Sequence, residues 1–209
     1  MDLLFYRVVR GIVAGFCRVF WRLRVSGQEH LPPTGAYVVA PVHRSNIDTP
    51  LIAAISRRRL RFMGKDSLWS KGWSAWLFSA LGGFPVHRGN VDREALRRCI
   101  AVIEGGEPLV IFPEGTRREG ATVEELYDGA AYVAARTGVP IVPVGIGGSQ
   151  AAMPRGAKGL RPVKIHVVIG PPLYPPSSGR TSRRAVHELT DALHKELQRL
   201  FDEAQARAA

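Results

Sequence analysis

The sequence predicts an α/β fold in which a mostly parallel central sheet is flanked by helices. Short apolar runs, typical of buried strands, alternate along the chain with amphipathic stretches that are typical of helices. This alternation favours parallel pairing, because a helix carries the chain back to the start of the next parallel strand. The apolar runs cover residues 37–42, 60–63, 109–112, 140–146 and 163–169.

The clearest helical stretches between and after these runs cover residues 92–104, 129–137 and 182–206. A chain of 209 residues lies within the size range of one domain and is long enough to bury a substantial core. We therefore predict one domain, residues 26–209, preceded by an N-terminal helical segment of residues 1–25.

The amino-acid composition indicates which kind of binding partner to expect. The chain carries 29 Lys and Arg against 18 Asp and Glu, a formal charge of +11, which favours an anionic partner. No helix-turn-helix, zinc-finger or RNP signature accompanies these charges, so nucleic acid is not the expected partner. Cys17 and Cys99 lie in apolar stretches without metal-ligand spacing and are predicted to be reduced, buried thiols.

The first 25 residues predict an amphipathic helix. The longest uncharged run, residues 11–17, is well short of the ~20 residues that a membrane span requires. An apolar face opposed to an arginine face is typical of a helix lying in the interface of an anionic membrane. The alternative is a helix docked on the protein's own core. The apolar face holds Phe5, Val8, Val9, Ile12, Val13, Phe16, Val19, Phe20 and Leu23, and the other face Arg7, Arg10, Arg18 and Arg22.

A second aromatic stretch lies between the second and third apolar runs, residues 60–63 and 109–112. Trp69, Trp73 and Trp76 recur at a spacing that puts them on one face of a helix. Such a stripe suits either packing in the core or an aromatic belt at a lipid interface.

The stretch PVHRSNIDTP places His43 after a predicted strand and Asp48 before the next apolar run. In one continuous helix the two side chains would be roughly 140° apart. A strand end followed by a helix start instead brings the carboxylate close enough to accept the imidazole N–H, as in an oriented general base. The alternative is structural, since Ser45 followed three residues later by Asp48 also fits a helix-capping pattern.

The stretch PLVIFPEGTRREG delivers a carboxylate, a glycine and a guanidinium at the end of another predicted strand. Glu114 is followed by Gly115, which allows the backbone to approach a ligand closely, and by Arg117, whose planar fork suits phosphate oxygens. An internal Glu–Arg salt bridge on a turn is the competing interpretation. Since carboxyl ends of parallel strands share one edge, His43 and this turn are expected to lie on the same side of the sheet.

Two further stretches are weaker signals when each is taken alone. GGFPVHRG, residues 82–89, holds an extended segment between glycines that could present Arg88 to an anion. GVPIVPVGIGG, residues 138–148, has glycines that leave room beside a substrate, but it also reads as an ordinary buried strand.

Together the four stretches, in this order, resemble the glycerolipid acyltransferase family that includes 1-acylglycerol-3-phosphate acyltransferases of the bacterial PlsC type. The likeness covers roughly residues 25–169. The motifs appear as His43 and Asp48, as residues 83–88, as FPEGTR at residues 112–117, and as residues 139–144. Val42 departs from the pattern, because many relatives have asparagine before the histidine.

The resemblance implies a glycerol-3-phosphate acyltransferase-like fold and the transfer of an acyl group from a thioester to a lysophospholipid hydroxyl. His43 and Asp48 would be the catalytic pair. Arg88, Arg117 and Lys65 of the segment FMGKDSL would hold the acceptor phosphate, with Gly115 and Thr116 in the same turn. Glu114 would contact the glycerol hydroxyl or fix Arg117. We expect no metal and no cofactor, with acyl-CoA or acyl-carrier protein as co-substrate.

The expected reaction gives phosphatidic acid from lysophosphatidic acid at the sn-2 position. The expected location is the cytoplasmic face of the cell membrane, held monotopically at the phospholipid surface. Two alternatives stay open at this point: an acyltransferase of the same fold with another acceptor, such as glycerol 3-phosphate or an amino-lipid, and a non-catalytic basic module that binds lipid or nucleic acid. A binding module has no need of an oriented imidazole, which argues against the second.

Overall fold

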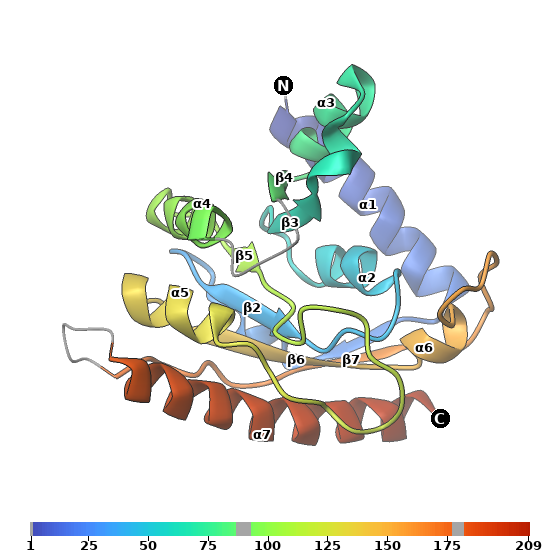
Figure 1. The fold of residues 1–209 in the computed structure, drawn as a ribbon. Coiled ribbons are helices and arrows are strands. Elements are labelled where there is room, and N and C mark those ends of the chain that lie inside the picture. Colours follow the sequence, from blue (N-terminus) through green and yellow to red (C-terminus); the bar gives the residue numbers. More distant parts are fainter. Residues whose placement is uncertain (1, 87–92, 177–181) are drawn as a thin grey trace.

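The computed structural model describes residues 2–86, 93–176 and 182–209. In this part of the chain seven strands form one sheet in the order β1-β7-β6-β2-β5-β3-β4 (Figure 1). The strands are β1 (Arg24–Ser26), β2 (Val38–Pro41), β3 (Arg61–Lys65), β4 (Gly83–Val86), β5 (Leu109–Val110), β6 (Ile141–Gly147) and β7 (His166–Ile169).

The sheet is mostly parallel, which confirms the predicted fold class. Strand β2 lies at its centre, parallel to both β5 and β6, and β3 is parallel to β4 and β5. Strand β7 runs antiparallel to β6, and β1 then pairs in parallel with β7 at the edge. The carboxyl ends of β2, β3, β4, β5 and β6 therefore share one edge of the sheet.

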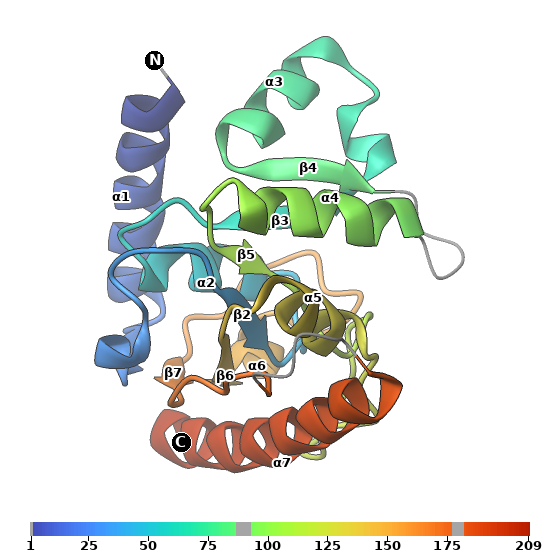
Figure 2. The ribbon, with the colours of Figure 1, turned by 90° about the vertical axis from the view of Figure 1, so that its left-hand side faces the viewer.

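Helices cover the sheet on both sides. Helices α7, α5 and α4 lie along one side, whereas α1 and α2 lie on the other, and α3 lies beyond β4 (Figure 2). The helices are α1 (Asp2–Phe20), α2 (Asp48–Ile55), α3 (Gly72–Ala80), α4 (Arg93–Glu104), α5 (Gly129–Thr137), α6 (Ser149–Ala152) and α7 (Arg183–Ala208). Two short 3-10 turns, η1 (Gln28–His30) and η2 (Asp66–Trp69), follow β1 and β3.

The two central strands explain why their sequences read as continuous apolar runs. Every residue of β2 and β6 is buried, as expected for parallel strands covered on both faces. Helix α7 approaches β6 so closely that a Cβ atom on Gly145 would lie 2.3 Å from the carbonyl oxygen of Leu200. A Cβ on Gly147 would similarly lie 2.1 Å from the carbonyl oxygen of Ala204. These two glycines allow α7 to lie directly on the sheet.

Several element bounds match the sequence prediction, and others are shifted. Helix α5 covers the predicted residues 129–137, and α2 begins at Asp48, in agreement with its predicted place in a first helical turn. The N-terminal helix ends at Phe20, and residues 24–26 form β1. The sheet thus begins inside the segment that the sequence assigned to the N-terminal helix.

Candidate active site

The structure brings His43 and Asp48 together at the carboxyl end of β2. The imidazole Nδ1 of His43 lies 3.0 Å from Oδ2 of Asp48, with 17% of the histidine side chain exposed and none of the aspartate. Because a carboxylate accepts, Nδ1 carries the proton and Nε2 is left as the nitrogen that accepts one. The predicted contact is present and has the geometry of an oriented general base.

Asp48 also has a structural role in the turn before α2. Its Oδ2 accepts the backbone N–H groups of Arg44 and Ser45, each at 2.7 Å. These bonds close the turn that leads into α2, whose N-cap is Ile47 without a side-chain cap hydrogen bond, so the predicted helix cap by Ser45 and Asp48 is not formed. One carboxylate thus holds the turn of residues 43–48 together and orients the imidazole.

The PEGTR turn lies against this pair. The rings of His43 and Phe112 have centroids 4.1 Å apart, and the backbone N–H of Arg118 donates to the carbonyl oxygen of His43 at 2.9 Å. Gly115 has a φ of +65°, and a Cβ there would lie 2.7 Å from the ring of Tyr127. The turn therefore requires glycine both for its backbone and for the space beside it.

Glu114 has a partner that the sequence analysis did not anticipate. Its carboxylate is fully buried and accepts from Nη1 of Arg44 at 2.7 Å and 2.8 Å, so its observed cationic partner is Arg44 and not Arg117. Oε1 also accepts the backbone N–H of His43 at 2.9 Å. The expectation that Glu114 fixes Arg117 is corrected accordingly. The available signal for Arg44 was its charge next to His43, directly after a predicted strand.

The structure describes some of the remaining predicted anion ligands more fully than others. Arg117 and Thr116 lie in the PEGTR turn, where Thr116 is exposed and Arg117 partly so. Lys65 ends β3, whose parallel alignment with β5 places its backbone at the same edge of the sheet as His43. Arg88 lies outside the described residues.

Neither cysteine resembles a nucleophile. Cys17 is fully buried in α1, and burial raises the pKa of its thiol to about 11. Cys99 is buried in α4, and burial raises its pKa to about 12. Both thiols are therefore almost entirely protonated at neutral pH, in which form they are poor nucleophiles.

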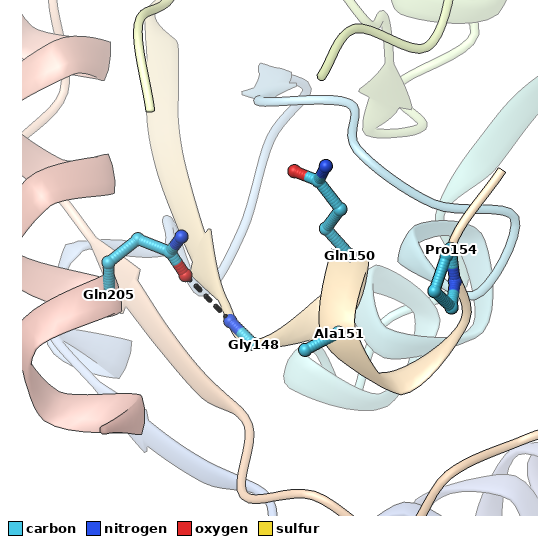
Figure 3. A pocket seen from close by; sticks show the side chains of 5 residues that line it. All are labelled: Gly148, Gln150, Ala151, Pro154 and Gln205. Atoms are coloured by element: carbon cyan, nitrogen blue, oxygen red, sulfur yellow. Dashed lines mark hydrogen bonds between the residues drawn. The ribbon is translucent and has the colours of Figure 1, made fainter. Parts of the chain in front are cut away.

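A hollow of about 380 Å³ lies beside α6, lined by Gly148, Gln150, Ala151, Pro154 and Gln205 (Figure 3). The amide of Gln205 accepts the backbone N–H of Gly148 at 2.8 Å, which joins the end of α7 to the start of α6. Among the predicted site residues that the structure describes, none lines this hollow, and the hollow is distinct from the His43–Asp48 pair.

Helix α1 both docks on the protein and exposes an apolar face. Tyr6, Ala14 and Cys17 are buried, whereas Ile12 is 68% and Val19 82% exposed. The two alternatives for this helix thus apply to different faces of it. In the described part of the chain, no helix is long and apolar enough to cross a membrane.

One of the four predicted surface arginines belongs to the docked face. The guanidinium of Arg10 donates to the carbonyl oxygens of Ala54, at 3.1 Å, and of Ser56, both near the end of α2. Burial lowers the pKa of Arg10. Arg7, Arg18 and Arg22 are exposed, so the arginine face is smaller than the sequence predicted.

Helix α3 extends the exposed apolar surface of α1. Trp73 is 66% and Trp76 55% exposed, and the rings of Trp76 and Phe5 have centroids 5.1 Å apart. Trp69 precedes α3 in η2 and donates its indole N–H to Ser79, so the three tryptophans do not form one helical stripe. We call the following exposed residues the α1–α3 surface: Leu3, Leu4, Val8, Ile12, Phe16, Val19, Trp73 and Trp76.

Fold and site together define an α/β protein with an imidazole–carboxylate pair at the carboxyl edge of a mostly parallel sheet. The chain belongs to the Acyltransferase family, whose profile matches residues 22–147. This assignment agrees with the family resemblance of the four sequence motifs.

The chain is similar to several characterised members. A crystal structure of the 1-acyl-sn-glycerophosphate acyltransferase PlsC from Thermotoga maritima superposes with a TM-score of 0.80 at 27% identity, covering 98% of this chain and 83% of that one. The 1-acyl-sn-glycerol-3-phosphate acyltransferase of Bacillus subtilis is 28% identical over 85% of this chain and 87% of its own length. A chloroplastic enzyme of the same name from Brassica napus is 29% identical over 74% of this chain, which spans 46% of that longer protein.

Proposed function

We propose that this protein transfers a fatty acyl group from a thioester to the sn-2 hydroxyl of 1-acylglycerol 3-phosphate, giving phosphatidic acid. The observation that carries the proposal is the His43–Asp48 pair, 3.0 Å apart beside the PEGTR turn. We infer the identity of the acceptor from the relatives of Thermotoga maritima and Bacillus subtilis, which match most of this chain. The donor would be acyl-CoA or acyl-carrier protein.

The reaction needs no covalent acyl-enzyme. Nε2 of His43 takes the proton of the acceptor hydroxyl while its oxygen bonds to the thioester carbonyl carbon. Asp48 stabilises the resulting imidazolium through Nδ1. The tetrahedral intermediate then collapses, the C–S bond breaks, and the departing thiolate takes the proton from the imidazolium.

The acceptor phosphate would bind along the same edge of the sheet. Arg117 offers a planar fork for two phosphate oxygens, and Lys65 offers a point charge from the end of β3. Gly115 and Thr116 lie in the turn between Glu114 and Arg117, and Arg88 follows the parallel strand β4. Binding of the phosphate by these residues would bring the acceptor hydroxyl to His43.

The α1–α3 surface would hold the enzyme on the membrane that contains its lipid substrates. Its leucine, isoleucine, phenylalanine and tryptophan side chains are the types that enter the headgroup boundary. Arg7 and Arg18 are exposed residues of α1 and would contact anionic headgroups. The α1–α3 surface lies across the molecule from α7 (Figure 1), so the sheet would stand between α7 and the lipid. We place the protein on the cytoplasmic face, as a monotopic peripheral enzyme.

The test is acyl transfer by the purified protein, with acyl-CoA or acyl-carrier protein and a panel of acceptors that includes glycerol 3-phosphate. His43→Ala should lower kcat by about 10²- to 10⁴-fold, because proton removal is lost. Asp48→Asn should also cause a large loss, because an amide stabilises the imidazolium poorly. The matched control is His187→Ala, which removes a histidine that is 70% exposed on α7 and should leave kcat unchanged. Turnover by His43→Ala near that of the parent would refute the mechanism.

A further inference from the structure

A buried cation lies directly beside the proposed base. Only 1% of the Arg44 side chain is exposed, although arginine is almost never buried to this extent without compensating partners. Its Nη1 donates to both oxygens of Glu114, at 2.7 Å and 2.8 Å, and to the carbonyl oxygen of His43 at 3.1 Å. Its Nη2 donates to the carbonyl oxygen of Thr122 at 3.0 Å. The guanidinium thus links three separate segments of the chain.

The Arg44–Glu114 pair holds the backbone of His43 at both polar groups. Glu114 accepts the N–H of His43 at 2.9 Å, and Arg44 donates to its carbonyl oxygen. Asp48 in turn accepts the N–H of Arg44 and orients the imidazole. A buried ion pair, together with the N–H of Arg118 at the carbonyl oxygen, thus holds the His43 backbone, and a separate carboxylate orients its ring.

Helix α7 supports this pair from outside the region matched by the family. The ring of Phe201 lies 4.7 Å from the guanidinium carbon of Arg44, within the range of a cation–π contact. Gln198 accepts the N–H of Val123 at 2.7 Å and donates to the carbonyl oxygen of Ala121 at 3.1 Å. The segment that supplies the Thr122 carbonyl to Arg44 is thus fastened to α7.

We propose that Arg44 and Glu114 are positioning residues for His43, and that α7 stabilises them through Phe201 and the segment 121–123. Burying two charges costs free energy that an apolar pair would not, so such a pair is weak evidence for stability. Its contacts with both backbone groups of His43 give it a role in placing the base. A base displaced by even about 1 Å loses up to about 100-fold in rate.

This inference rests on the proposed function. It can be tested separately, because a positioning role and an acceptor-binding role of Glu114 predict different changes in kcat and KM. If Glu114 contacted the acceptor, Glu114→Gln would raise the KM for the acceptor. If Glu114 positions His43, the same variant lowers kcat and leaves that KM within about twofold, because ground-state binding is retained. We expect a loss in kcat of about 10- to 100-fold for Glu114→Gln and for Arg44→Met. Arg44→Lys should lie between Arg44→Met and the parent, since the charge remains and the fork is lost.

A remote variant keeps the test valid if a change in the ion pair prevents folding. Phe201→Leu leaves Arg44 and Glu114 intact and should lower kcat by several-fold at unchanged KM, by removing the ring beneath the guanidinium. The matched control is Arg199→Met on the same helix, which removes an exposed arginine paired with Glu196 and Glu203. That control should leave kcat and KM unchanged. Folding of every variant is checked by circular dichroism and thermal unfolding.

The outcomes separate the two proposals. A parent that transfers acyl groups, with lower kcat at constant KM in Glu114→Gln, Arg44→Met and Phe201→Leu, supports the positioning role. Unchanged kcat in folded Glu114→Gln, or a raised acceptor KM at constant kcat, would overturn it while leaving the proposed function intact. If the parent shows no transfer, the proposed function fails. The imidazole NMR signals of His43 then decide the positioning role: they should shift in Glu114→Gln but not in Arg199→Met, and equal spectra would overturn it.

Discussion

Helices α1 and α7 lie near opposite ends of the chain, and each carries apolar residues at helical spacing. In α7 the apolar residues Val186, Leu189, Leu193, Leu197, Leu200 and Phe201 are all buried. In α1 the buried residues include Tyr6, Ala14 and Cys17, whereas Ile12 and Val19 are among those that point away from the protein. The sheet covers the apolar face of α7, and no described part of the protein covers the outer face of α1.

This difference follows from what each helix lies against. Helix α7 runs across β6 and β7, where Gly145 and Gly147 let it pack closely. Helix α1 packs on α2, where Arg10 bonds to Ala54, and touches α3, where Phe5 contacts Trp76. Helical periodicity thus shows that a face is apolar but not what covers it. For α1 we propose that the cover is the lipid surface.

The largest expected effect is a difference in the free energy of unfolding between a variant in the core and a variant in the α1–α3 surface. Leu193→Ala in α7 should lower the free energy of unfolding by about 2–5 kcal/mol, since it leaves a cavity beneath the sheet. Ile12→Ala in α1 should change it by less than about 0.5 kcal/mol, because no packing is lost. Denaturant unfolding of the dilute protein without lipid measures both. Equal destabilisation by the two variants would show that the outer face of α1 is already covered in solution.

The next effect concerns vesicle binding. Ile12→Ser should weaken binding to lipid vesicles by about tenfold or more, since full burial of such a side chain is worth about 1.5–3 kcal/mol. Its unfolding free energy should stay close to that of the parent. The control is Tyr174→Ser, which removes an exposed aromatic residue outside the α1–α3 surface. If both variants bind vesicles as the parent does, the α1–α3 surface is not the membrane contact.

The smallest effect separates the arginines of α1 from one another. Arg7→Gln and Arg18→Gln should each weaken binding to anionic vesicles by about 1 kcal/mol at low salt, and by less at high salt. Arg10→Gln should leave vesicle binding unchanged and instead lower stability, because it removes the bonds to Ala54 and Ser56. Cosedimentation with anionic and neutral vesicles measures the first effect, and thermal unfolding the second.

The arginine prediction fails in either of two ways. Equal losses for Arg10→Gln and Arg18→Gln on anionic vesicles would mean that α1 detaches from α2 when it binds lipid. Equal losses on anionic and neutral vesicles would mean that charge does not contribute to binding. The control for general charge is Arg184→Gln, an exposed arginine at the start of α7.

Much of the site could be predicted because its signals are local. Only four residues separate His43 from Asp48, and the change from strand to helix between them is visible in the apolar pattern. That change predicts that the two side chains lie close together, and the observed distance is 3.0 Å. For Glu114, by contrast, the sequence suggested a glycerol hydroxyl or Arg117 as the partner and did not indicate Arg44. Arg117 is its neighbour in sequence, but Arg44, 70 residues away, is its neighbour in the fold.

The sequence by itself determined the α/β class, the bounds of α5, the pairing of His43 with Asp48 and the amphipathic character of both terminal helices. These features depend on backbone preferences and on periodicities within about twenty residues. The tertiary structure alone decided that β7 reverses beside β6, that β1 pairs with residues about 140 positions away, and that Arg44 is buried against Glu114 and Phe201. It also decided that the side chain of Arg10 bonds to the end of α2, whereas that of Ile12 stays exposed. The physical reason is that burial and hydrogen-bond partners are set by segments brought together from distant parts of the chain.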